Sequence, residues 1–514
     1  MPKQQTDHLL QLIRTLTPAE KRHFRLFAKR NQSSADILFL QLFDLLDKSG
    51  KYNEALLLKK IPGLKKAQLA NQKAHLMRQL LTSLRMLAKK RNEDIQIRES
   101  IDFAKVLYDK GLYHQALEIL AKAKEVALKN QAFPLGLEII EFEKLIEGQY
   151  ITRSLEGRAG ELACQSKEII DQNIRTTDFT NLSIMMYGLY LRNGFARNNS
   201  DSKKAKKYFN DNLPKTRFEK LDFLGKVFFC QSYVWLYHIC QEFLACFKYA
   251  QKWVNLFEEQ PQMKNLFAPL YIKGLHHLIN SLFHNLHYDR FLIALKEFEK
   301  VPLHINFKNN ANVESLFHQY RFLHLINKHY LEGTFSEGVA IIPELAKLLN
   351  TNKYNWDEYR ILVFNYRIAC LYFGDEDYDN AIDYLNKIIN EKVTSYRSDI
   401  QCFARILCLL AHFELGNRNL VEYQIRSVYR FLLRVEEMQA VQQAIFNFLK
   451  RTQKTMPSEL NNEFKKLHAE LLPLEKMHFE SRPFLYLDII SWLEGKMYGT
   501  TIQQEIRKKF LARR

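Results

Sequence analysis

A recurring pattern of small and aromatic residues constrains this chain more than any other feature. Residues 103–127 read FAKVLYDKGLYHQALEILAKAKEVA, and residues 368–392 read IACLYFGDEDYDNAIDYLNKIINEK. Each segment has a small residue on a first helix, then a turn, an aromatic residue, and a second small residue three positions later: Ala104, Tyr113 and Ala116, then Ala369, Tyr378 and Ala381. Small residues at both contact positions let two antiparallel helices approach closely, and stacked pairs form a solenoid with a concave face.

The composition agrees with long helices joined by short connections. Only 17 glycines and 12 prolines occur among 514 residues, about half of the average usage of roughly 12%. No run alternates apolar and polar β-branched residues as a strand would. We therefore predict an all-α fold.

Aligning the aromatic residue that opens each second helix extends the pattern along the chain. Further pairs are predicted to open at Phe243, Tyr288 and Phe335, with Leu420 a weaker match. From Phe243 to Leu420 the intervals are 45, 47, 43 and 42 residues, so the period is near 45. Between residues 130 and 230 the signature is blurred, and helices alone are predicted there: 135–147, 155–170 and 179–192.

The pattern resembles the tetratricopeptide repeat family. The residues that carry the resemblance are Ala104, Gly111, Tyr113, Ala116 and Ala123, then Ala369, Tyr372, Tyr378 and Ala381. Elsewhere Gly338 and Cys246 stand at the small position, and Phe291 departs from it. The family repeats every 34 residues, whereas the period here is longer. The resemblance implies a degenerate, right-handed α-solenoid, and the whole chain resembles large uncharacterised bacterial helical-repeat proteins, which supplies no activity.

The same resemblance implies where a partner would bind. Some family members bind a partner's terminal carboxylate through Lys and Asn on the first helices of three repeats. The corresponding positions here are His276, Asn280, His324, Val363 and Arg367. Asn280 and Arg367 fit this arrangement, but the two lysines of the family are absent. The mapping nominates a concave face for a peptide, helix or folded partner. Its residues are Lys273, His276, Asn280, Phe283, Tyr320, Asn327, Tyr330, Tyr366, Arg367 and Phe373. Packing between the helices is the alternative role for many of them.

Charge divides the chain into a basic N-terminal module and a nearly neutral remainder. Residues 1–92 hold 19 Lys and Arg against 6 Asp and Glu, whereas residues 93–514 hold 56 against 51. We predict a helical module over 1–92, a repeat array over 93–455 and capping helices over 456–514. Basic clusters in the module are either solvated helix faces or a phosphate-binding surface for nucleic acid. The latter would use Lys21, Arg22, Arg25, Lys29, Arg30, Lys65, Lys66, Lys89, Lys90 and Arg91.

Local signals set the ends of several helices. Thr17, Pro18 and Glu20 form a capping-box sequence for the helix that follows. Further helices in the module are expected at 36–46, 53–60 and 65–90, and Thr501 is expected to cap the last helix.

The sequence offers little reactive chemistry. The seven cysteines show no CxxC spacing, and no stretch reaches the 18 or so apolar residues of a membrane span. Eight histidines gather between His276 and His329, without the HExxH or ExxH spacing of a metal site, and no phosphate-binding glycine loop or nucleophile motif occurs. We therefore expect a cytoplasmic protein that is not an enzyme and needs no metal or cofactor.

Two functional hypotheses follow from these features. The first is a non-catalytic interaction scaffold that binds a protein or peptide on the concave face. The alternative is a nucleic-acid-associated regulator, in which residues 1–92 contact phosphates while the solenoid senses a peptide or protein.

Overall fold

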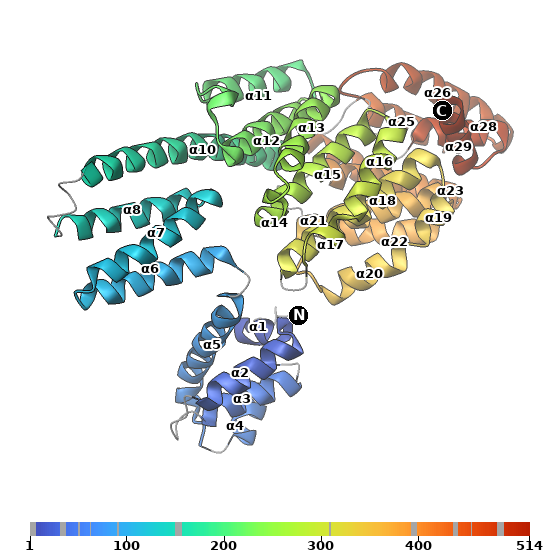
Figure 1. Ribbon diagram of the computed structural model, residues 1–514. Helices are drawn as coiled ribbons and strands as arrows, with labels where there is room; N and C mark the ends of the chain where they lie inside the picture. The colour runs from blue at the N-terminus through green and yellow to red at the C-terminus, as the bar shows by residue number, and fades with distance from the viewer. Residues whose placement is uncertain are drawn as a thin grey trace. The chain divides into compact units, whose positions relative to one another are not determined.

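The computed structural model describes most of the chain, and it divides that chain into two compact units, residues 1–173 and 174–514 (Figure 1). The described residues are 7–30, 37–49, 52–61, 63–89, 92–149, 157–307, 310–391, 398–434, 440–453, 455–480 and 488–514. They contain helices and no strand, which confirms the predicted all-α class for this part of the chain. None of the helices in these ranges has the length and apolar character to cross a bilayer.

Unit 1 contains the N-terminal helices and the beginning of α10. Its helices are α1 (His8–Thr15), α2 (Pro18–Arg30), α3 (Ile37–Ser49), α4 (Glu54–Lys60), α5 (Lys66–Lys89), α6 (Glu93–Asp109), α7 (Tyr113–Lys129) and α8 (Phe133–Glu147). One hydrophobic core joins residues 9–80, and another joins residues 97–146. The basic helices thus have a core of their own, although the compact unit extends beyond the boundary predicted at residue 92.

The capping box predicted at the start of α2 is present. The Thr17 backbone N–H donates to Glu20 Oε2 at 2.7 Å, and the Glu20 N–H donates to Thr17 Oγ1 at 3.3 Å. The reciprocal pair satisfies backbone donors that the first helical turn leaves without intrahelical partners. Sequence alone therefore located this helix start correctly.

Unit 2 begins within α10 and consists of helix pairs that follow one another along the chain. Its helices are α10 (Ala159–Asn193), α11 (Asn199–Asp211), α12 (Phe223–Ile239), α13 (Phe243–Glu259), α14 (Met263–Leu266), α15 (Ala268–His284), α16 (Tyr288–Glu299), α17 (Val301–His304), α18 (Ala311–Glu332), α19 (Phe335–Val339), α20 (Ile342–Thr351), α21 (Glu358–Gly374), α22 (Tyr378–Ile389), α23 (Ser398–Glu414), α24 (Arg418–Arg434), α25 (Ala440–Thr452), α26 (Leu460–Glu475), α28 (Ile489–Tyr498) and α29 (Ile502–Arg513). One hydrophobic core runs through it from Phe223 to Ile506.

Helix α10 corrects one prediction. Separate helices were expected over 155–170 and 179–192, but a single helix runs from Ala159 to Asn193. The intervening residues 171–178 contain no Gly or Pro. Without such a residue nothing in the backbone interrupts the hydrogen-bond ladder, so the helix continues.

The aromatic residues predicted to open the second helices do so. Tyr113, Phe243, Tyr288, Phe335 and Tyr378 are the first residues of α7, α13, α16, α19 and α22. Leu420 is not an opening residue, since α24 begins two positions earlier at Arg418.

The small residues predicted at helix contacts are buried as well. Ala104, Ala116, Ala369 and Ala381 are all fully buried. The spacing of small and aromatic residues thus reported the helix pairs and their boundaries.

The turns between these helices share one backbone conformation. A residue with positive φ stands two positions before the start of α7, α8, α13, α16, α19, α22 and α24: Gly111, Gln131, Gln241, Leu286, Gly333, Glu376 and Gly416. In each turn the next N–H bonds back to a carbonyl five residues earlier, as His287 does to Leu282 at 3.0 Å. This is the Schellman arrangement, which satisfies carbonyls at the end of the first helix.

Leu286 carries strain that a glycine would relieve. Its φ is +57° and its side chain is exposed, and in that conformation the Cβ of a residue other than glycine crowds the backbone, which is unfavourable. Leu286→Gly is expected to raise the free energy of unfolding by about 0.5–1 kcal/mol, measured by chemical denaturation. Leu286→Ala keeps the Cβ and serves as the control. Equal stability of the two variants would contradict the prediction.

The C-terminal helices do more than cover the last pair. Helix α26 packs on α25, whereas α28 and α29 run back along the turns of earlier pairs. Trp492 Nε1 donates to Glu414 Oε1 at 2.7 Å, the Ile502 N–H donates to Glu376 Oε1 at 3.1 Å, and Arg507 Nη1 donates to the Glu332 carbonyl at 3.2 Å. The segment therefore joins α18, α21 and α23 at their C-terminal ends and belongs to the core of unit 2.

Candidate functional site

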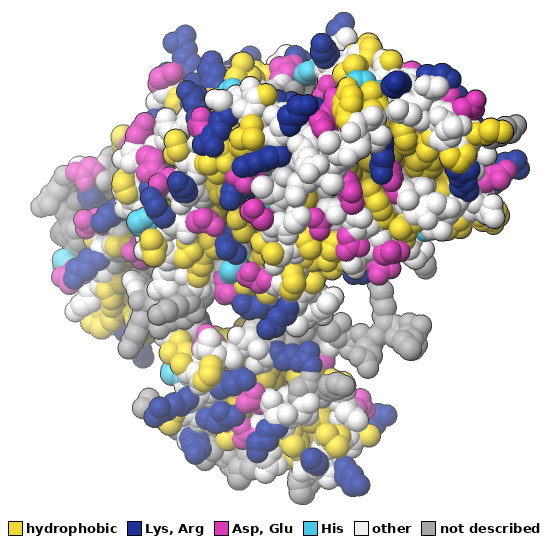
Figure 2. Space-filling view, turned by 90° about the vertical axis from the view of Figure 1, so that its right-hand side faces the viewer, with side chains coloured by type: hydrophobic (Ala, Val, Ile, Leu, Met, Phe, Trp, Pro, Cys, Tyr) yellow, Lys and Arg dark blue, Asp and Glu magenta, His cyan; other side chains and the backbone are white. Residues whose placement is uncertain are grey.

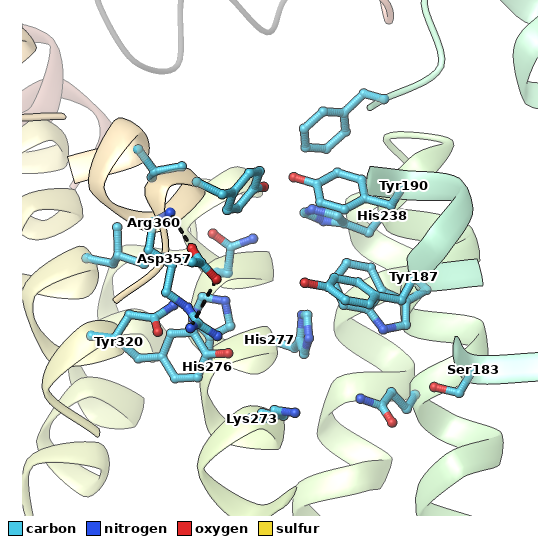
Figure 3. A pocket seen from close by; sticks show the side chains of 18 of the residues that line it. Ser183, Tyr187, Tyr190, His238, Lys273, His276, His277, Tyr320, Asp357 and Arg360 are labelled. Carbon is cyan, nitrogen blue, oxygen red and sulfur yellow. Dashed lines mark hydrogen bonds and ion pairs between the residues drawn. The ribbon is translucent and has the colours of Figure 1, made fainter. Parts of the chain in front are cut away.

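A cavity formed by described residues lies within unit 2, among the first helices of successive pairs. Its volume is about 490 Å³, and its walls come from α10, α12, α15, α18 and α21, with Ile400 of α23. Figure 3 shows Tyr187 and Tyr190 on one wall, Asp357 and Arg360 on the opposite wall, and His276 and His277 between them. Segments about 170 residues apart in sequence thus share one pocket.

Helical periodicity explains which side chains reach the pocket. On α15 the lining residues are Leu270, Lys273, His276, His277, Asn280 and His284; apart from the adjacent pair of histidines they recur every three or four positions. That spacing places them on one face of the helix, while the residues between them pack into the core. The same spacing selects the lining residues of the other walls.

Seven of the ten residues predicted on a concave face line this pocket. They are Lys273, His276, Asn280, Tyr320, Asn327, Tyr366 and Arg367. The other three do not: Phe283, Tyr330 and Phe373 are buried in the hydrophobic core. Phe283 and Phe373 point into packing between helices, and Tyr330 donates its hydroxyl to the Arg367 carbonyl at 2.7 Å. Their role is to hold the helices that carry the pocket.

Sequence reasoning missed the wall formed by α10 and α12. This wall contributes Tyr187, Tyr190, Gln231, Trp235 and His238. Tyr187, Tyr190 and Trp235 pack on one another, with ring centroids 4.9 Å apart for Tyr187 and Trp235 and 5.3 Å for Tyr190 and Trp235. The blurred small-residue signature hid the register of these helices. A search for aromatic and amide residues every three or four positions could have found them.

Histidines form the floor of the pocket and are held as neutral groups. His276 Nδ1 lies 3.1 Å from His324 Nε2, and the His276 ring stacks on Tyr320 with centroids 3.8 Å apart. Burial lowers the pKa of His277 to about 3, and burial with the nearby Arg367 lowers the pKa of His324 to about 3. Burial also holds the pKa of His276 well below its ordinary value. His276 and His277, which line the pocket, therefore offer it polar, uncharged surface at neutral pH, whereas His324 is fully buried beside His276.

Arg367 of α21 is positioned by two residues of α18. Its Nη1 donates to Asn327 Oδ1 at 2.7 Å, and its guanidinium lies over the Tyr330 ring at 5.6 Å. The contacts fix a cation at the wall of the pocket.

The other charged residues of the pocket are on α15 and at the start of α21. Burial and the nearby Arg360 lower the pKa of Lys273. Arg360 pairs with Asp357 at 3.3 Å, and Asp357 also caps the start of α21 by accepting the Arg360 N–H at 2.8 Å. Three cations line the pocket against this single carboxylate, so with neutral histidines its net charge is positive.

The basic N-terminal surface is partly neutralised within the chain. Lys21 pairs with Asp47 at 2.6 Å, and Arg25 pairs with Asp44 at 2.9 Å and with Asp47 at 3.1 Å. Lys66 lies 3.7 Å from Glu54. These ion pairs reduce the cationic charge that is left for phosphate groups.

The other predicted phosphate contacts divide into exposed residues and residues without a described side chain. Arg22, Lys29 and Lys65 are exposed. Figure 2 shows such basic side chains over α1–α5, at the bottom of the view. Lys90 and Arg91, and the side chains of Arg30 and Lys89, lie outside the described part of the chain.

No group of three or more His, Cys, Asp or Glu side chains is arranged to hold a metal ion in the ranges that the structure describes. Comparison of the chain with protein-family models, curated proteins and solved structures gives no match. The function must therefore be argued from the pocket itself.

Proposed function

We propose that this protein is a non-catalytic binding protein that holds a short peptide segment in the pocket of unit 2. The observation that carries the proposal is the set of carboxamides contributed by three successive first helices. They are Gln231 on α12, Asn280 on α15, and Gln319 and Asn327 on α18. An amide side chain both donates and accepts hydrogen bonds, as each peptide unit of a ligand does, so these side chains match a peptide backbone. The oxygen of Asn327 already accepts from Arg367, which leaves its N–H groups as donors.

The aromatic wall supplies the apolar part of such a site. Tyr187 and Trp235 lie side by side on α10 and α12 and face the cavity. Rigid aromatic side chains bury large areas at low entropic cost, which makes them frequent anchors for bound residues. A ligand side chain packed there would fix the register of the peptide along the amides.

The size of the cavity favours a short segment over a folded partner. Its volume of about 490 Å³ lies within the range of roughly 300–1,000 Å³ that enclosed ligand sites occupy. A folded protein would instead need a broad exposed surface.

The wider architecture is proposed to be a tetratricopeptide-like α-solenoid. Two features support it: the repeated turn conformation before each second helix, and the contacts of each first helix with the next, as between α12 and α15, α15 and α18, and α18 and α21. Contacts limited mainly to neighbours in the chain are typical of repeat proteins. The seven cysteines, which form no disulfide in the described part of the chain, favour a cytoplasmic location.

Peptide capture tests the proposal directly. A pool of random N-acetylated, C-amidated hexapeptides is passed over the immobilised full-length chain, and a recovered peptide is titrated by calorimetry. Tyr187→Ala is expected to weaken its binding at least tenfold, because an aromatic anchor is worth about 1.4 kcal/mol or more.

Tyr423→Ala is the matched control. Tyr423 is an exposed helical tyrosine on α24 outside the pocket, and its removal should leave the affinity unchanged. Recovery of no peptide above background would overturn the proposed function. Equal affinity of the wild-type chain and Tyr187→Ala would show that peptides bind elsewhere.

A further inference from the structure

Part of the N-terminal module carries basic residues and no acidic ones. Residues 55–92 contain ten Lys and Arg side chains and no Asp or Glu, whereas the other 476 residues contain 65 Lys and Arg against 57 Asp and Glu. The structure places most of this stretch in α4, in α5 and in the turn that joins them. A local excess of one sign of charge attracts a ligand of the opposite sign.

Several of these cations have no carboxylate partner. Three are paired: Lys66 with Glu54, Lys73 with Asp7, and Arg85 with Asp102. The pairs of Lys66 and Arg85 lie at the surface, where an ion pair contributes little to stability. Among the residues that the structure describes, no ion pair engages four other cations of the stretch, all of them exposed: Lys59, Lys60, Lys65 and Arg78. Their charge is available to a ligand.

The turn between α4 and α5 gathers most of these cations. Ile61 and Leu64 are buried in the core of the module, and the Leu64 N–H donates to the Ile61 carbonyl at 3.2 Å. These contacts fix the turn. Four lysines are therefore held on the two sides of one short connection: Lys59, Lys60, Lys65 and Lys66.

Helix α5 exposes short side chains next to this turn. Leu69, Leu76 and Leu80 are buried and attach the helix to the core of the module. The exposed positions recur every three or four residues and so form one face, which in the first half of the helix carries Ala67, Ala70, Asn71 and Ala74. Residues 67–74 extend about 12 Å along the helix axis. Lys66 precedes them and Arg78 follows one turn later.

Duplex DNA matches this face in charge and in shape. The major groove of B-DNA is roughly 12 Å wide and admits an α-helix, and short exposed side chains let a helix approach the floor of the groove. The cations before and after residues 67–74 then face the phosphates, which contribute much of the affinity of such complexes. Asn71 lies between these cations, and a carboxamide is the side-chain group that pairs best with adenine.

Two other anionic surfaces fit this face less well. Duplex RNA has a deep, narrow major groove that side chains cannot read, so α5 has no groove to enter. A membrane surface binds basic helices through large apolar residues such as Trp, Phe and Leu. Over residues 67–74 the exposed side chains are instead Ala, Gln and Asn.

We propose that the surface of α4 and α5 binds duplex DNA, with the first half of α5 in the major groove and the neighbouring cations on the phosphate backbone. This function is separate from the pocket of unit 2. Lys21 and Arg25 of α2, on the basic surface shown in Figure 2, take no part because they pair with Asp44 and Asp47. The residues that contact phosphates are Lys59, Lys60, Lys65, Lys66 and Arg78.

The salt dependence of binding tests the proposal. Fluorescence anisotropy of a labelled DNA duplex of random sequence measures binding to the full-length chain at KCl concentrations from about 50 to 300 mM. Five phosphate contacts should make the logarithm of the association constant fall linearly with the logarithm of the salt concentration, with a slope of about −4.5.

Two triple variants assign the binding to this surface. A variant with Lys65→Gln, Lys66→Gln and Arg78→Gln should bind the duplex about tenfold more weakly or worse, and its slope should be shallower by about 2.7. The control removes three exposed lysines of unit 2 and leaves both quantities unchanged: Lys296→Gln, Lys347→Gln and Lys508→Gln. Circular dichroism confirms that both variants are folded.

A duplex RNA of the same length and vesicles that contain an anionic phospholipid are measured in parallel. The DNA should bind about tenfold more tightly than the RNA, because α5 cannot enter the major groove of an A-form helix. Absence of DNA binding at the lowest salt concentration would overturn the proposal, and so would equal affinity for the RNA or tighter binding to the vesicles. An equal loss of affinity in the two triple variants would show that net charge, and not this surface, attracts the DNA.

Discussion

Replacement of Trp492 by alanine is expected to lower the free energy of unfolding of unit 2 by about 3–5 kcal/mol. Trp492 is fully buried on α28, and its ring packs edge-on against Phe448 and Phe464 at centroid distances of 6.1 and 5.9 Å. Its indole N–H donates to Glu414 Oε1 at 2.7 Å. The substitution leaves a large cavity between α25, α26 and α28, and it removes one of the two partners that Glu414 has on this helix.

Urea denaturation followed by circular dichroism measures this loss. Tyr498→Ala on the same helix is the control, because Tyr498 is 65% exposed and its truncation should change stability by less than about 0.5 kcal/mol. Limited proteolysis should release α28 and α29 from the Trp492 variant sooner than from the wild-type chain. A loss below about 1 kcal/mol for Trp492→Ala would mean that this helix does not belong to the core of unit 2.

Acidification is expected to destabilise unit 2 through its buried histidines. The pKa values of His277 and His324 are lowered to about 3 in the folded chain from an ordinary value of 6.5. Below pH 6.5 the unfolded chain takes up protons at these residues and the folded chain does not, so stability falls as the pH drops from 6.5 toward 3. At pH 5.5 each histidine should cost about 1.4 kcal/mol relative to pH 7.5.

A double variant, His277→Gln with His324→Gln, isolates this contribution. The free energy of unfolding of the variant and of the wild-type chain is measured at pH 7.5 and 5.5. The double variant should lose about 3 kcal/mol less than the wild-type chain between the two pH values. His304→Gln, at an exposed histidine of α17, is the control and should leave the pH dependence unchanged. An identical loss in the wild-type chain and the double variant would show that these imidazoles do not carry the acid sensitivity.

Local signals in the sequence accounted for the helices and many of their boundaries. Thr17 and Glu20 capped α2, Thr501 and Gln504 capped α29, and Tyr378 opened α22, because capping and turn formation depend on residues only a few positions apart. Non-glycine residues such as Leu286 and Gln241 also adopt the turn conformation, and nothing in their residue type indicates it. Surrounding packing imposes that conformation on them.

Only part of the pocket lining could be predicted from the sequence. The mapping onto the tetratricopeptide pattern put Lys273, Asn280 and Arg367 on one face, and all three line the pocket. Tyr187 on α10 and Trp235 on α12 were missed because the small-residue signature that sets the repeat register is blurred between residues 130 and 230. The aromatic wall of α10 and α12 therefore appeared only in the tertiary structure.

The amino-acid sequence by itself determined the all-helical class, the helix pairs and many helix boundaries, because these arise from interactions within a few residues along the chain. Only the tertiary structure decided that Phe283 enters the core while its neighbour His284 lines the cavity. Adjacent residues on a helix point about 100° apart, and the rotation of each helix about its axis is set by the side chains of the helices packed against it. The same packing brought Lys273 and Arg360, 87 positions apart in the chain, into the lining of one pocket.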